Sequence, residues 1–368
     1  YKSSITDIKE FGPLELSTSA SFYGTNLLGL TSANYNLTAI DDPAISTTTL
    51  KDTFRGASIV KGNFSNWRIE NVTSLENTFR DAEDFDSPLT DWDVSNVTTL
   101  KSTFEGAAAF NQPLNWDTSG VTTFNSMFKS ASAFNSPLGF DTVSGTNFAY
   151  MFNDAIAFNQ DIGSFNMENA TDISYMLKGA TSFNLPLLNW NINSFQTTSN
   201  TFAGTRLFNQ NLGGWDMTAV SNTSNMFAEA VSYNNQGTDL NTWDLLGVTN
   251  ASGMFYSASA FNQSLAWNTL TSLQNADEMF YNAAAFNQDI SSMPIQNLQT
   301  AWKMLDGTSF SQTNYDTLLV TWAALSPIPP NISFSAADTN YTIATSQIAR
   351  NVLTGGPNNW YIVDKGGL

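Results

Sequence analysis

Residues 151–162 read MFNDAIAFNQDI, and close variants of this stretch recur along most of the chain. Its first aromatic residue, Phe152, belongs to a column of aromatic or leucine residues usually preceded by Thr or Met. The members of this first column are Phe54, Phe79, Phe104, Phe128, Phe152, Leu177, Phe202, Phe227, Phe255, Phe280 and Leu305. Neighbouring members are 24 to 28 residues apart, which indicates about eleven copies of one repeated unit.

Two further columns accompany the first. In most copies a second aromatic residue follows six residues later, and it is followed directly by an asparagine: Asn111, Asn135, Asn159, Asn184, Asn209, Asn234, Asn262 and Asn287. A third column is mostly tryptophan: Trp67, Trp92, Trp116, Phe140, Phe165, Trp190, Trp215, Trp243 and Trp267. We expect the asparagines to form an amide ladder that bonds the backbone of neighbouring copies. The aromatic columns are expected to form the core.

The spacing of apolar residues predicts the local structure of one copy. Val97, Leu100, Phe104, Ala107 and Phe110 are 3, 4, 3 and 3 residues apart, which is typical of one face of a short helix. Trp92 and Val94, with polar neighbours, indicate a strand of a few residues. Eight apolar positions in 25 residues cannot enclose a core, so each copy must stack on the next. The predicted fold is therefore an α/β repeat solenoid with short parallel strands.

The repeat pattern divides the chain into three parts of one continuous domain. We expect an N-terminal cap at 1–47, where residues 5–8 could form a strand, the repeat solenoid at 48–313 and a C-terminal cap at 314–368. Within the C-terminal cap, the pattern predicts a helix over 315–325 and an extended segment over 331–334. A second helix is expected over 344–353, followed by a last strand over 360–364.

Composition excludes several classes of function. The 368 residues include no Cys and no His, so thiol chemistry and a Ser–His–Asp mechanism are impossible. A net charge of −18 opposes binding to nucleic acid or to anionic lipid. No run of about 18 apolar residues is present, so we expect no membrane insertion. The chain is predicted not to be an enzyme.

Three stretches resemble a known family: residues 151–162, WDVSNVT at 92–98 and FNQDI at 286–290. They are similar to the BspA-like, or DUF285, surface-protein repeats, which are related to leucine-rich repeats. The C-terminal stretch NYDTLL at 314–319 also resembles the element that closes such arrays. The resemblance implies a secreted or surface-anchored protein with roles in adhesion or surface coats, and it implies no catalytic residues.

Acidic residues raise two chemical alternatives to a purely structural role. The position after the Trp column carries Asp93, Asp117, Asp141, Asn166, Asn191, Asp216, Asp244 and Asn268, a line of oxygen donors that could bind Ca²⁺. The densest cluster of acids, Asp81, Glu83, Asp84, Asp86, Asp91 and Asp93, could form a glycosidase centre. We favour turn and cap chemistry for the first and a solvated acidic face for the second. No cofactor is expected, with Ca²⁺ as the alternative.

Ten Asn-x-Ser/Thr sequons give moderate support for a secreted glycoprotein. The chain starts at Tyr1 without Met, which fits either a mature form whose signal peptide has been removed, the reading we favour, or a trimmed chain. The candidate sites for N-glycosylation are Asn36, Asn71, Asn96, Asn169, Asn331 and Asn340. Asn71, Asn96 and Asn169 share one position in the repeat, where we expect an exposed corner. Asn262 is also a sequon, but it belongs to the asparagine column and is predicted to stay unmodified.

Three functions remain open, all of them extracellular or at the cell surface. In the first, the chain is an adhesive or coat protein that presents one face of the solenoid to proteins or glycans. In the second, it polymerises end to end through terminal strands, with residues 1–11 as the donated strand. In the third, it is a glycan-binding module, for which Tyr150, Tyr175, Tyr256 and Tyr281 are the best contact candidates because they fall outside the core columns.

Overall fold

A computed structural model of the chain describes residues 48–57, 64 and 67–368. The expected N-terminal cap at 1–47, with its strand at 5–8 and the donor segment at 1–11, lies outside the described residues. The chain falls into two compact units, Tyr1–Leu185 and Pro186–Leu368. The single continuous domain expected from the sequence stays a prediction.

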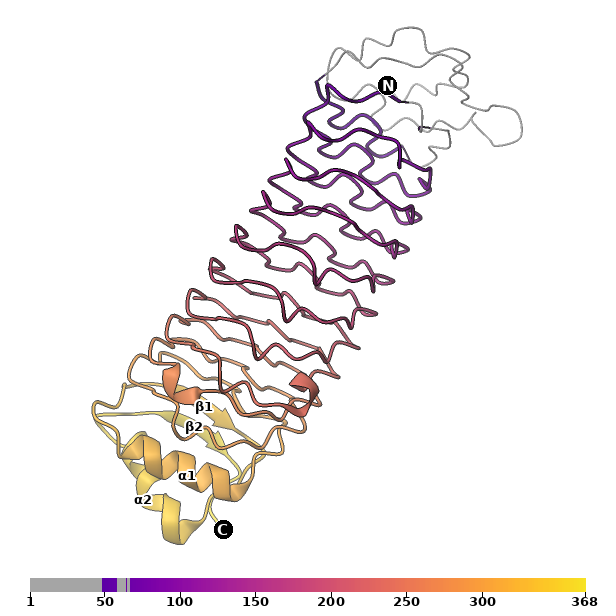
Figure 1. The fold of residues 1–368 in the computed structure, drawn as a ribbon. Helices are drawn as coiled ribbons and strands as arrows, with labels where there is room; N and C mark the ends of the chain where they lie inside the picture. The colour runs from indigo at the N-terminus through magenta and orange to yellow at the C-terminus, as the bar shows by residue number, and fades with distance from the viewer. Residues whose placement is uncertain (1–47, 58–63, 65–66) are drawn as a thin grey trace, which may run out of the picture. The chain divides into compact units, whose positions relative to one another are not determined.

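In each unit the copies lie one on another, as the successive loops of Figure 1 show. Equivalent residues of neighbouring copies pair through isolated parallel bridges. In the first unit these bridges link Thr49, Ser74, Thr99, Thr123, Asn147 and Asp172 in order. In the second unit they link Thr197, Asn222, Asn250, Asn275 and Thr300. The chain is therefore a repeat protein whose copies pair in parallel, as expected, although through single residues instead of extended strands.

The prediction of a short helix in each copy is wrong. The helices among the described residues are α1 (Gln312–Ala323), α2 (Ile343–Thr354) and two 3₁₀ turns, η1 (Asn235–Gly237) and η2 (Trp267–Thr269). The segment that looked helical is a series of tight turns, in which the N–H of Thr103 donates to the carbonyl of Leu100 and that of Ala107 to Phe104. Turns that advance three residues at a time give nearly the apolar spacing of a helix, which explains the error.

Between these turns, alternate N–H groups donate to the next copy. Ser102, Phe104 and Gly106 donate to the carbonyls of residues 125, 127 and 129, at 2.9, 2.8 and 2.7 Å. Ser102 and Gly106 lie in the left-handed region, with φ of 53° and 72°. That conformation aims their N–H groups across the stack, so the turn segment bonds to its neighbour as a strand would.

Aromatic side chains from all three columns fill the interior of the stack. Phe104 stacks on Phe79 and on Phe128, each at 5.6 Å between ring centroids, and packs on Phe110 of its own copy at 4.0 Å. The predicted core residues are all at most 3% exposed: Phe79, Phe104, Phe128, Phe152, Trp92, Trp116, Trp190 and Trp215. The indole N–H of Trp116 donates to the carbonyl of Leu89 in the preceding copy, at 2.9 Å. Each ring therefore contacts the copies on both sides.

The C-terminal cap follows its prediction closely. Its helices and strands alternate as α1, β1 (Ser333–Ala336), α2 and β2 (Tyr361–Asp364), and β1 pairs in parallel with β2. Helix α1 starts three residues before its predicted start because Ser311 is the N-cap and its hydroxyl accepts from the N–H of Asn314, at 3.2 Å. Trp322 of α1 donates its indole N–H to Met293, so the helix continues the bonding of the Trp column.

A glycine substitution tests the left-handed turn position. Gly179 has a φ of 71°, and a Cβ there would collide with Oδ1 of Asp154 in the preceding copy. We expect Gly179→Ala to lower the free energy of unfolding by about 1–3 kcal/mol in chemical denaturation. Gly139→Ala is the control, because a Cβ at Gly139 meets nothing within 4 Å. Equal stability of the two variants would contradict the assigned turn.

Candidate functional site

The asparagine column forms a ladder of side-chain acceptors along each stack. In the first unit, Oδ1 of Asn111 accepts the N–H of Asn135 at 2.8 Å, and Oδ1 of Asn135 accepts that of Asn159 at 2.8 Å. Asn159 accepts in the same way from Asn184, at 3.0 Å. In the second unit the same bonds link Asn209, Asn234, Asn262 and Asn287. The structure therefore places the predicted ladder residues in one repeated bonding pattern.

At the two ends of the asparagine column, other residues make the equivalent hydrogen bonds. At the first copies, a carboxylate oxygen of Asp86 accepts the N–H of Asn111 at 2.9 Å. At the C-terminal cap, Oδ1 of Asn287 accepts the N–H of Ser311 at 2.8 Å and the side-chain amide of Asn314 at 2.9 Å. The same ladder therefore fixes the start of α1 on the last copy.

The acidic column after the Trp column is used in local turns. In each of seven copies the side-chain oxygen accepts the backbone N–H two residues later; the acceptors are Asp93, Asp117, Asp141, Asn166, Asn191, Asp216 and Asp244. Three of them accept a hydroxyl as well. The hydroxyl and then the N–H of Ser95 hold the pKa of Asp93 below its ordinary value, and Ser119 does the same for Asp117. Thr218 has this effect on Asp216.

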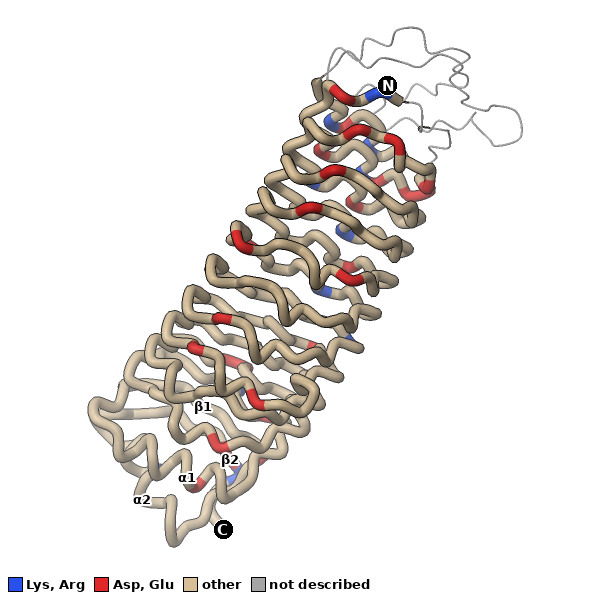
Figure 2. Tube along the Cα trace, viewed as in Figure 1, with Lys and Arg blue, Asp and Glu red and all other residues tan. Residues whose placement is uncertain are grey.

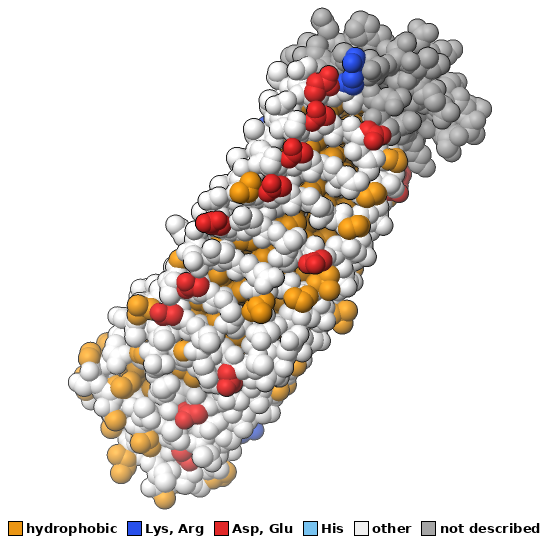
Figure 3. Space-filling model, viewed as in Figure 1, with side chains coloured by type: hydrophobic (Ala, Val, Ile, Leu, Met, Phe, Trp, Pro, Cys, Tyr) orange, Lys and Arg blue, Asp and Glu red, His pale blue; other side chains and the backbone are white. Residues whose placement is uncertain are grey.

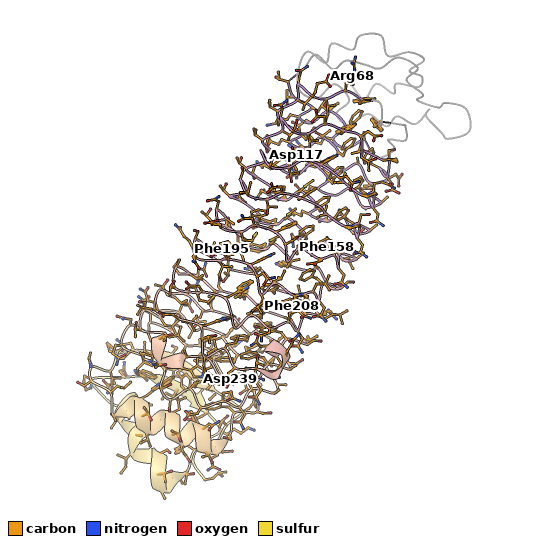
Figure 4. All side chains as sticks on the ribbon, in the orientation of Figure 1. Arg68, Asp117, Phe158, Phe195, Phe208 and Asp239 are labelled. Carbon is orange, nitrogen blue, oxygen red and sulfur yellow. The ribbon has the colours of Figure 1, made fainter. Side chains whose placement is uncertain are left out.

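Asp93, Asp117, Asp141 and Asp216 are exposed, and Asp117 is labelled in Figure 4. Figure 3 shows acidic side chains on the surface of each unit. Because an Asn in the same position makes the same bond to the backbone, a charge is not needed there. No group of three or more acidic residues among those described is placed to hold a metal ion. The observed geometry is that of a repeated turn.

The acidic cluster between residues 81 and 93 is divided among several structural roles. Asp81 lies 3.5 Å from Arg80, Asp86 begins the amide ladder, and Asp93 closes its turn with Ser95. Glu83, Asp84 and Asp91 are exposed. The members therefore face different partners, and the structure does not join them into one site.

Cations concentrate on the face formed by the turn segments. Glu76 lies between Lys51 at 2.8 Å and Lys101 at 3.5 Å; burial opposes its ionisation, but these two lysines hold its pKa below the ordinary value. Glu105 lies between Arg80 at 3.3 Å and Lys129 at 3.1 Å. Figure 2 shows blue segments near red ones in these copies. In these first copies the cations of the turn segments therefore lie close to acidic residues of the same face.

The tyrosines outside the core columns form two stacked pairs on the turn face. Tyr150 and Tyr175, both half-buried, stack at 4.5 Å, and Tyr256 stacks on Tyr281 at 5.3 Å. A lysine amine flanks each pair: Lys178 lies 5.3 Å from the Tyr175 ring and Lys303 lies 5.3 Å from the Tyr281 ring. Tyr150 and Tyr175 adopt φ of 61° and 60°, a conformation that bulky residues rarely adopt.

Sequence reasoning missed Trp302. It is half-buried, whereas the other nine tryptophans are at most 5% exposed, and its ring stacks on the exposed Tyr361 at 5.9 Å. The sequence contained the signal, because Trp302 lies three residues before Leu305 of the first column and outside the Trp column.

Four candidate glycosylation sites are exposed: Asn71, Asn96, Asn169 and Asn331. Nδ2 of Asn96 donates to the carbonyl of Glu70 at 2.8 Å, and Nδ2 of Asn169 donates to Val143 at 2.9 Å. Asn340 is half-buried, with Nδ2 bonded to Gly366, and Asn36 lies outside the described residues.

One family model matches the chain, over residues 48–144, 115–215 and 197–318; its description is "Mycoplasma protein of unknown function, DUF285". No curated protein matches the chain. Across the residues that the structure describes, no helix is long and apolar enough to cross a membrane.

A substitution in the ladder tests its contribution to stability. Oδ1 of Asn135 accepts from the N–H of Asn159 and from the amide of Gln160, at 2.8 and 3.1 Å. Asn135→Ala leaves both donors without this acceptor, and we expect a loss of about 1–3 kcal/mol in the free energy of unfolding. Asn135→Asp keeps an acceptor, as Asp86 does, so denaturation should show a smaller loss. Equal losses would contradict the ladder.

The turn carboxylates predict a dependence of stability on pH. Because their pKa values are lowered on folding, Asp93, Asp117 and Asp216 stabilise the fold at neutral pH, and this contribution is lost as the pH falls through the folded pKa. We expect the melting temperature of the D93N/D117N/D216N variant to fall less than that of the wild type between about pH 5 and about pH 2. If the melting temperatures of the variant and the wild type fell equally with pH, this assignment would be contradicted.

Proposed function

The chain belongs to the DUF285 family, and from this membership we propose that it is a non-enzymatic structural and adhesive protein of the cell surface. The proposal includes the architecture: a leucine-rich-repeat-like solenoid of about eleven coils over 48–313, capped at both ends. Such an array offers a long, regular surface, which suits contacts with proteins or glycans better than it suits a single reactive centre.

The observation that carries the proposal is that the repeated polar side chains accept hydrogen bonds from backbone N–H groups. Oδ1 of Asn135, of Asp117 and of their equivalents in other copies accepts a backbone N–H group. Bonds of this kind hold each side chain in place within its turn or between neighbouring copies. We propose no cofactor, Ca²⁺ included, because Asn166 and Asn191 fill the same turn as the aspartates without a charge.

Glycan binding is a second candidate, favoured by the surface aromatics. Trp302, Tyr361 and the two tyrosine pairs lie outside the core columns, and aromatic rings with a polar tip are common at binding surfaces. A glycan array tests this candidate. Binding that is lost in Trp302→Ala, with unchanged melting, would support it.

End-to-end polymerisation is a third candidate. Strand β2 ends the two-stranded sheet β1–β2, so a strand from another molecule could pair with it by β-augmentation. The donor expected from the sequence, residues 1–11, lies outside the described residues. Negative-stain microscopy at high protein concentration separates this candidate from the others, since it alone predicts filaments.

Surface labelling tests the main proposal. Antibodies raised against residues 48–368 should label intact cells of the source organism without permeabilisation. Glycopeptide mass spectrometry of the native protein should find Asn71, Asn96 and Asn169 modified and Asn262 unmodified, because Oδ1 of Asn262 accepts the N–H of Asn287 inside the ladder. Labelling that requires permeabilised cells, together with unmodified sequons, would contradict a surface location.

A further inference from the structure

Tyr150 and Tyr175 form a close parallel pair in the first unit. Their ring centroids are 4.5 Å apart, and the angle between the ring planes is 8°. The two residues hold the same position in consecutive copies, and the N–H of Tyr150 donates to the carbonyl of Ser174 at 3.0 Å. Burial and then the neighbouring Tyr175 raise the pKa of Tyr150, which indicates that the two phenol groups are close together. The rings therefore lie face to face with their hydroxyls at the same end.

The backbone position of this pair is a costly one for tyrosine. It lies two residues before the first column, and every described copy has a positive φ there. Seven of the other copies carry a short side chain or none at this position: Asp52, Asn77, Ser102, Ser126, Asn200, Asn225 and Gly253. Tyr150 and Tyr175 instead place a bulky ring there, with φ of 61° and 60°. Strain of this kind is concentrated at functional sites, which makes the pair a candidate site.

A lysine lies over each ring of the pair. Nζ of Lys129 is 5.8 Å from the centroid of the Tyr150 ring, and Nζ of Lys178 is 5.3 Å from that of the Tyr175 ring. Each tyrosine therefore has a ring and a cation as neighbours, and each is only half-buried. With a net charge of −18, two molecules of the protein repel each other. Reaction between the two tyrosines is thus favoured over reaction with a tyrosine of another molecule.

We propose that Tyr150 and Tyr175 form a site of oxidative cross-linking, at which a carbon–carbon bond joins the two rings as dityrosine. The oxidant is hydrogen peroxide acting through a haem peroxidase, which removes one electron and one proton from each phenol. The two phenoxyl radicals combine at ring carbons next to the oxygens, and the hydrogens on these carbons then move to the oxygens. In balance, two tyrosines and one hydrogen peroxide give one dityrosine and two waters.

This bond links two copies that otherwise meet through non-covalent contacts. The chain has no cysteine, so a disulfide cannot join them. Dityrosine closes the loop of residues 150–175, and a covalent link that closes a loop stabilises a fold chiefly by restricting the unfolded chain, as a disulfide does. The cross-link therefore gives the first unit a covalent tie between neighbouring copies.

Oxidation of the purified, unglycosylated chain with a haem peroxidase and hydrogen peroxide tests the proposal. Cleavage with trypsin and with a protease that cuts after Glu releases residues 130–168, which contain Tyr150, and residues 169–178, which contain Tyr175. In the monomer band of a denaturing gel, mass spectrometry should find these two peptides joined, with a mass two hydrogens below their sum. Fluorescence should show dityrosine in the same band.

The second tyrosine pair serves as a reference in the same digest. Tyr256 and Tyr281 are also half-buried, and Lys303 lies over the Tyr281 ring at 5.3 Å. Their ring centroids are 5.3 Å apart and the angle between the planes is 22°, so the rings lie further apart and are less parallel. The corresponding peptides, residues 230–278 and 279–303, should therefore be joined less often than those of the first pair.

Tyr175→Phe is the matched variant, because it keeps the ring and removes the hydroxyl that oxidation requires. It should lose the cross-link to Tyr150 and keep any cross-link between Tyr256 and Tyr281, and circular dichroism checks that it folds. Three outcomes would overturn the proposal. The joined peptides could be absent from the oxidised monomer, they could be no more abundant than those of the second pair, or they could occur only in covalent dimers.

Discussion

The structure depends on backbone hydrogen bonds between equivalent positions of neighbouring copies. Residues such as Ser102, Phe104 and Gly106 donate their N–H groups to the next copy, while the residues between them close tight turns within their own copy. Among the described copies, the turn segments need neighbouring copies to complete their backbone hydrogen bonds and to cover their core residues. Each copy is therefore stable only between neighbours, which explains why the same side chain recurs at the same position from copy to copy.

This constraint also determines where function can arise. Residues that repeat in every copy, such as the stacked phenylalanines and the asparagine ladder, hold the copies together. Residues that depart from the pattern are not needed to hold the copies together. Trp302 and Tyr150 are departures, both are at least partly exposed, and both lie on a surface suited to contacts. Binding by this protein is thus expected from its irregular positions.

Much of this arrangement could be predicted from the sequence, because a column of identical residues at a fixed interval implies stacking whatever the local structure. The aromatic core, the bonding of Asn135 to its neighbour and the helices of the cap follow from that reasoning. The tight turns within each copy could not be predicted in this way, because turns and helices share an apolar spacing of three to four residues. A signal was available: Gly56, Gly106, Gly179, Gly204 and Gly307 recur two residues after the first column, and glycine at a fixed position indicates a left-handed turn. At the other turn position, Ser102 and Tyr150 give no such signal.

Far-ultraviolet circular dichroism tests most directly whether the copies are joined by bonds between turns. With α helix confined to α1 and α2 among the described residues, the spectrum should show little helix, and heating should remove its signal in one cooperative transition with loss of aromatic stacking in the near ultraviolet. A pronounced helical double minimum, with about a third of the residues helical, would instead mean that each copy contains a helix, and it would contradict the account.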